Sequence, residues 1–135
     1  MGRGPHGYDT ITYREEHTRC SACHFDGSTF NPLELHHICG RSGKRACDHR
    51  NYLMLCRDCH SCFHHVSAGS QQLSLGNILW VKADEDGEGG EAGLDLAFLA
   101  SVRNRKALKE DPTEPPQWVF DARRDNGTAG WWNQH

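Results

Sequence analysis

The fold is decided by two short stretches, LELHHI at residues 33–38 and NYLMLCRDCHSCFH at residues 51–64. The first stretch alternates apolar and polar residues with period two, which predicts a half-buried β-strand. The second stretch opens with a short apolar run that predicts another strand. From Asp58 or Cys59 to about Val66 it then continues without a helix breaker, which predicts two turns of α-helix. This order of elements indicates a small α+β domain.

Two Cys-x-x-Cys pairs flank the first predicted strand, Cys20 with Cys23 and Cys56 with Cys59. Each pair directs two thiolates at one point, so the two pairs together supply the tetrahedral shell of a structural Zn²⁺ ion. A chain of 135 residues that is 36% hydrophobic has a marginal core. We therefore expect a four-cysteine zinc site that holds this domain together.

Other chemistry of the same cysteines is less well supported. Both pairs precede histidine, as CSACH and CRDCH, and Cys-x-x-Cys-His is also the signature of c-type haem attachment. Haem attachment requires export, and the N-terminal residues lack the apolar stretch of a signal peptide. A redox pair requires a thioredoxin-like βαβ pattern, which the sequence lacks. We expect a reducing, cytoplasmic setting, with Cys39, Cys47 and Cys62 as small apolar residues or alternative ligands.

The charge of the chain is unevenly distributed. The net charge is -3, yet residues 36–65 carry five Arg or Lys against two Asp, whereas residues 82–121 carry ten acids against five bases. A basic, histidine-rich middle is sufficient to meet a phosphate backbone with modest, salt-sensitive affinity. No stretch approaches the roughly 20 apolar residues of a membrane-spanning helix, so we expect no membrane partner.

Four histidines form the candidate catalytic group. His36 and His37 are adjacent on the predicted strand, so their side chains point to opposite faces, and one can bind a metal while the other acts as a base. His60 and His64 are four residues apart and share one face of the predicted helix. Three neutral imidazoles with open coordination positions are typical of a catalytic metal site.

The chain from about residue 20 to residue 65 resembles the HNH endonucleases, whose ββα-metal fold places a two-stranded hairpin against a helix with one divalent ion between them. The order His-His, Asn, His-x-x-x-His is particularly similar to that of the nuclease colicins. The flanking cysteine pairs are similar to those of phage and bacterial HNH proteins with a zinc knuckle. The resemblance implies hydrolysis of DNA phosphodiester bonds, by nicking or double-strand cleavage, leaving 5′-phosphate and 3′-hydroxyl ends.

The resemblance also implies a role for each residue of the signature. His37 would be the general base that activates water, and Asn51 would brace the loop and orient that base. His36, His60 and His64 would hold the catalytic divalent cation. Many relatives have an acidic residue where this chain has His36. An all-histidine shell favours Zn²⁺, Ni²⁺ or Mn²⁺ over Mg²⁺, so the identity of the catalytic ion stays open.

Contacts to DNA are expected from basic residues around this group. Arg41, Lys44 and Arg45 lie in a glycine-rich loop between the two predicted strands, and Arg57 would reach phosphate or cover the zinc site. The alternative function is a non-catalytic zinc-binding module for nucleic acid or protein. Such a module needs the four cysteines, but it does not need His37 and Asn51 at this spacing.

The rest of the chain is expected to support this core. Trp80 and Trp118 would anchor a helical extension on the core, or the extension would dock a protein partner or a second copy of the chain. The segment TITYREEH is expected to be a short strand or turn. The predicted organisation is a flexible N-terminus at 1–15, a zinc-stapled nuclease core at 16–68, a helical extension at 69–120 with helices at 71–83 and 94–109, and a mobile tail at 121–135.

Overall fold

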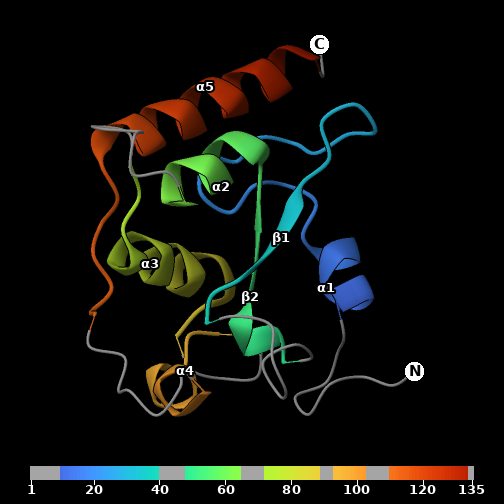
Figure 1. Cartoon of the computed structure of the whole chain (residues 1–135). Helices are drawn as coiled ribbons and strands as arrows, with labels where there is room; N and C mark the ends of the chain where they lie inside the picture. Colours follow the sequence, from blue (N-terminus) through green and yellow to red (C-terminus); the bar gives the residue numbers. More distant parts are fainter. Residues whose placement is uncertain (1–9, 40–47, 65–71, 89–92, 103–109, 134–135) are drawn as a thin grey trace.

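The computed structural model describes residues 10–39, 48–64, 72–88, 93–102 and 110–133 of the chain. It contains a two-stranded antiparallel sheet and five α-helices within these residues, which confirms a small α+β fold (Figure 1). The elements follow in the order α1 (Thr10–Glu16), β1 (Glu34–His37), the 3₁₀ helix η2 (His49–Asn51), β2 (Tyr52–Leu55), α2 (Arg57–His64), α3 (Leu75–Asp86), α4 (Leu96–Val102) and α5 (Gln117–Asn133).

The sheet pairs β1 with β2 so that Glu34 lies opposite Leu55 and His37 lies opposite Tyr52. Both strands and the helix that follows them were predicted from the two stretches at 33–38 and 51–64, and the structure confirms them. Side chains alternate between the faces of a strand. Glu34 therefore points with His36 toward α2, whereas Leu35 packs beside Tyr52 on the face covered by α1 (Figure 1).

One hydrophobic cluster joins the sheet to the C-terminal helices. Leu53 and Leu55 of β2 are fully buried, and they belong to the same cluster as Leu79 of α3, Leu99 of α4 and Val119 of α5. Trp80 and Trp118 pack against the margin of this cluster, as predicted for the two anchors. The C-terminal helices are therefore part of the core that carries the sheet.

The third helix starts later than the interval 71–83 predicts. Ser74 caps its first turn: the Ser74 side chain accepts from the backbone of Asn77, and the Asn77 side chain accepts from the backbone of Ser74. This reciprocal capping sets the start of α3 at Leu75. The predicted helix at 94–109 is seen as α4 over Leu96–Val102, and residues 103–109 lie outside the described part of the chain.

The interval 121–135, for which a mobile tail is expected, contains most of helix α5, which continues to Asn133. Contacts more than 100 residues away along the sequence hold this helix. The Arg123 guanidinium donates to the carbonyl oxygens of Ser21 and Ala22 at 3.0 and 2.6 Å, and the Asn126 amide donates to the Cys23 carbonyl at 2.7 Å. Tertiary hydrogen bonds thus order a segment whose own sequence contains weak helix formers.

The segment TITYREEH also differs from its prediction, since most of it forms helix α1 and not a strand or turn. Tyr13 is its only fully buried side chain, and the Tyr13 ring meets the Tyr52 ring edge-on at 5.5 Å between centroids. Residues 1–9, which complete the predicted flexible N-terminus, lie outside the described residues. None of the described helices is both long enough and apolar enough to cross a lipid bilayer.

Candidate metal centres

The four cysteines of the two Cys-x-x-Cys pairs come together in one buried cluster. The Sγ atoms of Cys20, Cys23, Cys56 and Cys59 all lie within 4.8 Å of one another, and Cys23 Sγ is 3.7 Å from Cys56 Sγ. Tetrahedral Zn²⁺ with bonds of about 2.3 Å separates its sulfur ligands by about 3.8 Å. The donor set and its spacing therefore fit a structural zinc ion, as predicted.

Hydrogen bonds favour the thiolate at two of the four sulfurs, those of Cys20 and Cys56. The other three thiols donate toward Cys20 and hold its pKa well below that of an ordinary thiol. The backbone amides of Cys23 and Cys59 donate to the sulfurs of Cys20 and Cys56, each at 3.5 Å. Such donors favour the thiolate, which is the form that binds metal.

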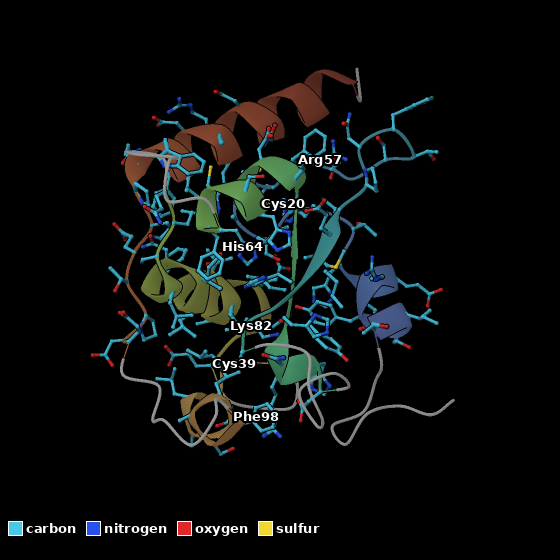
Figure 2. All side chains as sticks on the ribbon, in the orientation of Figure 1. Cys20, Cys39, Arg57, His64, Lys82 and Phe98 are labelled. Carbon is cyan, nitrogen blue, oxygen red and sulfur yellow. The ribbon has the colours of Figure 1, made fainter. Side chains whose placement is uncertain are left out.

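Three histidines form a second cluster, to which α2 contributes His60 and His64. His36 Nδ1 lies 3.2 Å from His60 Nε2, and His64 Nε2 lies 3.0 Å from the same atom. His36 is buried on β1, His60 is half-buried and His64 is exposed at the end of α2 (Figure 2). The structure thus brings together the three residues that the resemblance assigns to the catalytic cation.

The geometry of this cluster suits a divalent ion with imidazole ligands. Tetrahedral coordination at about 2.0–2.1 Å places neighbouring nitrogens about 3.3 Å apart, close to both separations. Burial lowers the pKa of His36 to about 3, and the adjacent His60 and His64 lower it in the same direction. His36 is therefore neutral at physiological pH, with a lone pair available to a metal.

Glu34, a residue not predicted from the sequence as part of the site, holds His60 in place. Glu34 Oε1 accepts a hydrogen bond from His60 Nδ1 at 2.7 Å, so the lone pair of His60 is on Nε2, the atom that faces the other two histidines. A carboxylate in this position fixes the tautomer and increases the basicity of a histidine ligand. The signal was present in the sequence, because Glu34 is two residues before His36 and must share its face of the strand.

His37, the predicted base, points to the other face of the sheet. Its ring meets the Tyr52 ring edge-on, with centroids 5.3 Å apart, and it is not a member of the three-histidine cluster. Adjacent strand residues must diverge in this way. A phosphate in contact with both His36 and His37 would therefore have to lie along the edge of β1 that is not paired with β2.

Asn51 is fully buried and braces the chain directly after His37. Its side-chain oxygen accepts from the amide of Cys39 at 2.7 Å, and its carbonyl oxygen accepts from the amide of Ile38 at 2.8 Å. These two hydrogen bonds hold the end of β1 against η2. A change at Asn51 would release the segment that carries His37.

The predicted DNA contacts are only partly within the described structure. Arg57 begins α2, at the opposite end from His64, and its side chain is 80% exposed (Figure 2). Its Nε atom lies 4.0 Å from Glu34 Oε2, so Arg57 is next to the residue that orients His60. Arg41, Lys44 and Arg45 lie outside the described residues.

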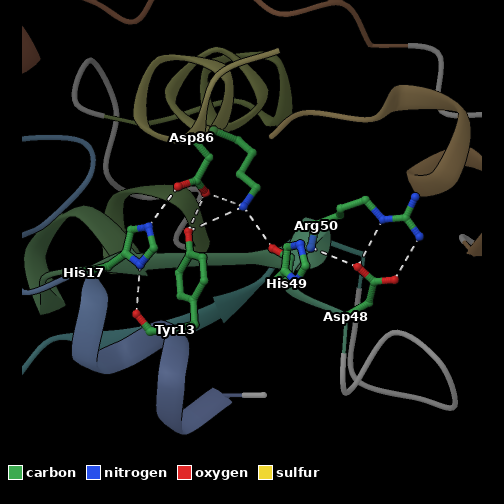
Figure 3. Close-up of polar contacts among 7 residues, drawn as sticks. Tyr13, His17, Asp48, His49, Arg50 and Asp86 are labelled. Carbon is green, nitrogen blue, oxygen red and sulfur yellow. Dashed lines mark hydrogen bonds and ion pairs between the residues drawn. The ribbon is translucent and has the colours of Figure 1, made fainter. Parts of the chain in front are cut away.

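A third polar centre, unrelated to the predicted site, surrounds the buried Lys82 of α3. The Lys82 ammonium donates to the carboxylate of Asp86 and, at 2.9 Å, to the carbonyl oxygen of His49. Asp86 also accepts from the Tyr13 hydroxyl at 2.7 Å and from His17 Nε2 at 2.8 Å (Figure 3). This network joins α1, η2 and α3. Its carboxylate is already satisfied by three donors, so we interpret it as a charge network and not as a metal site.

The hydrogen bonds of His17 require both of its ring nitrogens to carry a proton. Nε2 faces the Asp86 carboxylate and Nδ1 faces the Tyr13 carbonyl oxygen, each at 2.8 Å, and both oxygens can only accept. Burial lowers the pKa of His17, but the hydrogen bonds to Asp86 and Tyr13 outweigh it and the pKa is raised overall. Protonated His17 thus links the Tyr13 carbonyl of α1 to the Asp86 carboxylate of α3.

The chain matches no protein-family model, no curated protein and no solved structure.

Proposed function

We propose that this protein is a metal-dependent endonuclease of the HNH, or ββα-metal, type that hydrolyses phosphodiester bonds in DNA. The main support is the convergence of His36 from a strand with His60 and His64 from a helix, at separations of 3.0–3.2 Å between ring nitrogens. One of these ligands is exposed, so a bound ion could also contact substrate. A site with open coordination positions is typical of catalytic metals.

A divalent cation held there would stabilise the charge that develops on the phosphate and on the departing oxygen. The neutral imidazoles favour Zn²⁺, Ni²⁺ or Mn²⁺, and Mg²⁺ remains a candidate because substrate oxygens and water would complete its shell. Glu34 would keep His60 in the tautomer that a metal requires.

His37 would act as the general base. In the proposed step its imidazole removes a proton from water, the water oxygen bonds to phosphorus, and the bond from phosphorus to the 3′-oxygen breaks. That oxygen takes up a proton, so the products carry 5′-phosphate and 3′-hydroxyl ends. Asn51 would support this step indirectly, because it holds the two residues that follow His37.

The four-cysteine cluster supports a second candidate, a non-catalytic zinc module that binds nucleic acid or protein. This cluster is buried and complete without any of the histidines. Such a module accounts for the four cysteines, but it does not account for the convergence of the three imidazoles and Glu34.

A plasmid assay with a base-deficient variant tests the proposal. Supercoiled plasmid is incubated with the zinc-loaded protein and Mg²⁺, Mn²⁺, Ni²⁺ or Zn²⁺, with EDTA as the metal-free control. We expect nicked or linear products, and a loss of about 10²–10⁴-fold in rate for His37→Ala. His24→Asn is the matched control, because His24 is outside both clusters and asparagine tolerates its positive φ of 64°.

Two results would contradict the proposal. Equal rates for His37→Ala and the native protein would remove the base from its role. Absence of cleavage with all four ions, in a protein that retains zinc and still binds DNA, would favour the binding module.

A further inference from the structure

A cavity of about 520 Å³ lies between α5, the start of α2 and the loop that leads into β1. It is separate from the three-histidine cluster, and Cys23, Cys56 and Cys59 close one side of it. The residues that give it chemical character are Phe25, Asn31, Arg57, Asp58, Trp118 and Asn126. Its size is within the range of ligand-binding sites, about 300–1,000 Å³.

The lining combines flat aromatic surfaces with hydrogen-bond acceptors. Phe25 and Trp118 provide the aromatic surfaces. The side-chain nitrogen of Asn126 donates to the Cys23 carbonyl oxygen. The side-chain oxygen of Asn126 is then the group that can accept a hydrogen bond from a ligand. Asp58 adds a carboxylate. This combination suits a planar, uncharged group with N–H donors, such as a nucleobase.

The interior also disfavours anions. Four thiolates carry more negative charge than one Zn²⁺ ion neutralises, and the Asp58 carboxylate lies on the same wall. A phosphate group would be repelled from this interior. At the rim the charge is reversed, because the exposed Arg57 guanidinium is suited to bind a phosphate there.

Arg57 links the cavity to the three-histidine cluster. Its Nε atom is 4.0 Å from one oxygen of Glu34, and the other oxygen of Glu34 binds His60. The cavity rim and the cluster are thus connected through two side chains. One nucleic-acid strand that binds at the histidines would therefore pass close to Arg57.

We propose that this cavity binds a nucleobase that is unstacked from the strand beside the cleaved phosphate, with the phosphate of that nucleotide on Arg57. The preferred substrate is then DNA with a single-stranded or locally unpaired segment, because a paired base would first have to be extruded. This proposal rests on the proposed nuclease function and specifies its substrate class.

A binding experiment with a filled cavity tests it. Ala122 lies on α5 and lines the cavity, so Ala122→Phe should occupy the space that the base needs. Gln117→Phe is the matched control, since Gln117 is exposed on the same helix. Both changes are made in the His37→Ala background, so that the DNA stays intact. The probe is an oligonucleotide with one 2-aminopurine base, presented single-stranded, opposite an abasic site, or fully paired.

We expect Ala122→Phe to weaken binding of the single-stranded and abasic probes about 10-fold, because base stacking on aromatic side chains is lost. The change in 2-aminopurine fluorescence should disappear with it. The fully paired probe should bind equally to all three proteins. Zinc content and circular dichroism check that the filled variant folds, and Asn31→Ala, a change at an exposed lining residue, serves as a second variant.

Each outcome separates the two proposals. If neither variant weakens binding of the unpaired probes, the cavity proposal is wrong. Plasmid cleavage by the native protein, which retains His37, would still support the proposed nuclease function in that case. If the variants selectively lose binding of unpaired DNA, but the native protein cleaves plasmid with none of the four ions, the cavity proposal is supported and the proposed nuclease function is rejected. A cavity-dependent preference for a lysine-rich peptide over the oligonucleotide would assign the cavity to a protein partner.

Discussion

The four-cysteine cluster and the three-histidine cluster share one short helix, α2, and they differ in how far they are closed. The helix contributes Cys59 to the first cluster and His60 and His64 to the second. Cys59 contributes to a cluster whose four residues are all buried and which α5 covers through Arg123 and Asn126. His60, the residue after Cys59, is only half-buried, and His64, one turn beyond His60, is exposed.

The difference in closure limits what an ion held at each cluster could do. A closed sulfur site has no position for a substrate, so an ion held there contributes to folding. An open imidazole site can exchange a water molecule for a phosphate oxygen, so an ion held there can act on a substrate. The predictions below test whether the two clusters are separable in this way.

The largest effect is expected from Cys59→Ser. It removes one ligand of the closed site, and structural zinc in small domains contributes on the order of 10 kcal/mol to folding. We expect loss of about one zinc per chain, measured by metal analysis, together with loss of cooperative thermal unfolding. Cys62→Ser is the control, because Cys62 lies on the same helix but outside the cluster. An unchanged zinc content in Cys59→Ser would contradict the assignment.

His64→Ala should instead abolish activity and preserve the fold. We expect the rate of plasmid cleavage to fall at least about 100-fold, because the open site loses a ligand. The free energy of unfolding should change by less than about 1 kcal/mol, since His64 is exposed. Chemical denaturation measures the second quantity. If His64→Ala unfolds the protein as Cys59→Ser does, the two clusters are not separable.

Glu34→Gln should have a smaller effect on the same open site. The glutamine can still accept from His60 Nδ1, but it no longer increases the basicity of that ring. We expect binding of Mn²⁺ to weaken about 10-fold, measured by titration calorimetry on the zinc-loaded protein. Glu15→Gln on α1 is the control, because that carboxylate is exposed and distant from α2. Unchanged affinity would show that Glu34 has no part in metal binding.

The smallest effect is expected at the network around Lys82 and Asp86. This network includes the protonated ring of His17 and no metal ion. The folded pKa of His17 is raised, so its stabilisation is fully present below the unfolded pKa of about 6.5 and is lost as pH rises through the folded value. His17→Gln should therefore cost roughly 1–2 kcal/mol at pH 6 and less at pH 8.5.

Urea unfolding at the two pH values measures this difference. Ile11→Ala is the matched control, because Ile11 is exposed on α1 and has no titratable group, so the cost of this change should be the same at both pH values. A cost for His17→Gln that is the same at both pH values would show that His17 is not charged in the folded protein.

Much of the candidate site could be predicted from local patterns. Period-two alternation identifies the strand with His36 and His37, and the four-residue spacing of His60 and His64 places both rings on one helical face. The geometry of a Cys-x-x-Cys pair brings its own two thiols together, whereas the meeting of the two pairs, 33 residues apart, depends on the fold. Covalent spacing therefore restricts where neighbouring side chains can go, but it does not bring distant pairs into contact.

Other features depended on residues that are distant in sequence. Helix α5 is held in place by hydrogen bonds from Arg123 and Asn126 to backbone carbonyls of residues 21–23, in the loop of the first cysteine pair. The sequence of residues 121–133 does not predict these contacts. The burial of Lys82 likewise requires Asp86, His49 and Tyr13 to meet around it.

Spacing within a few residues predicts the two strands, helix α2 and the local pairing of the cysteine and histidine side chains that enter the two clusters. Only the packed chain shows which face of the sheet each helix covers, that α5 closes the sulfur cluster, that Glu34 and Arg57 connect the histidines to a cavity, and that His17 has an acceptor at both ring nitrogens. These features depend on which distant groups approach each other, and the free energy of burying them belongs to the assembled core and not to any one segment.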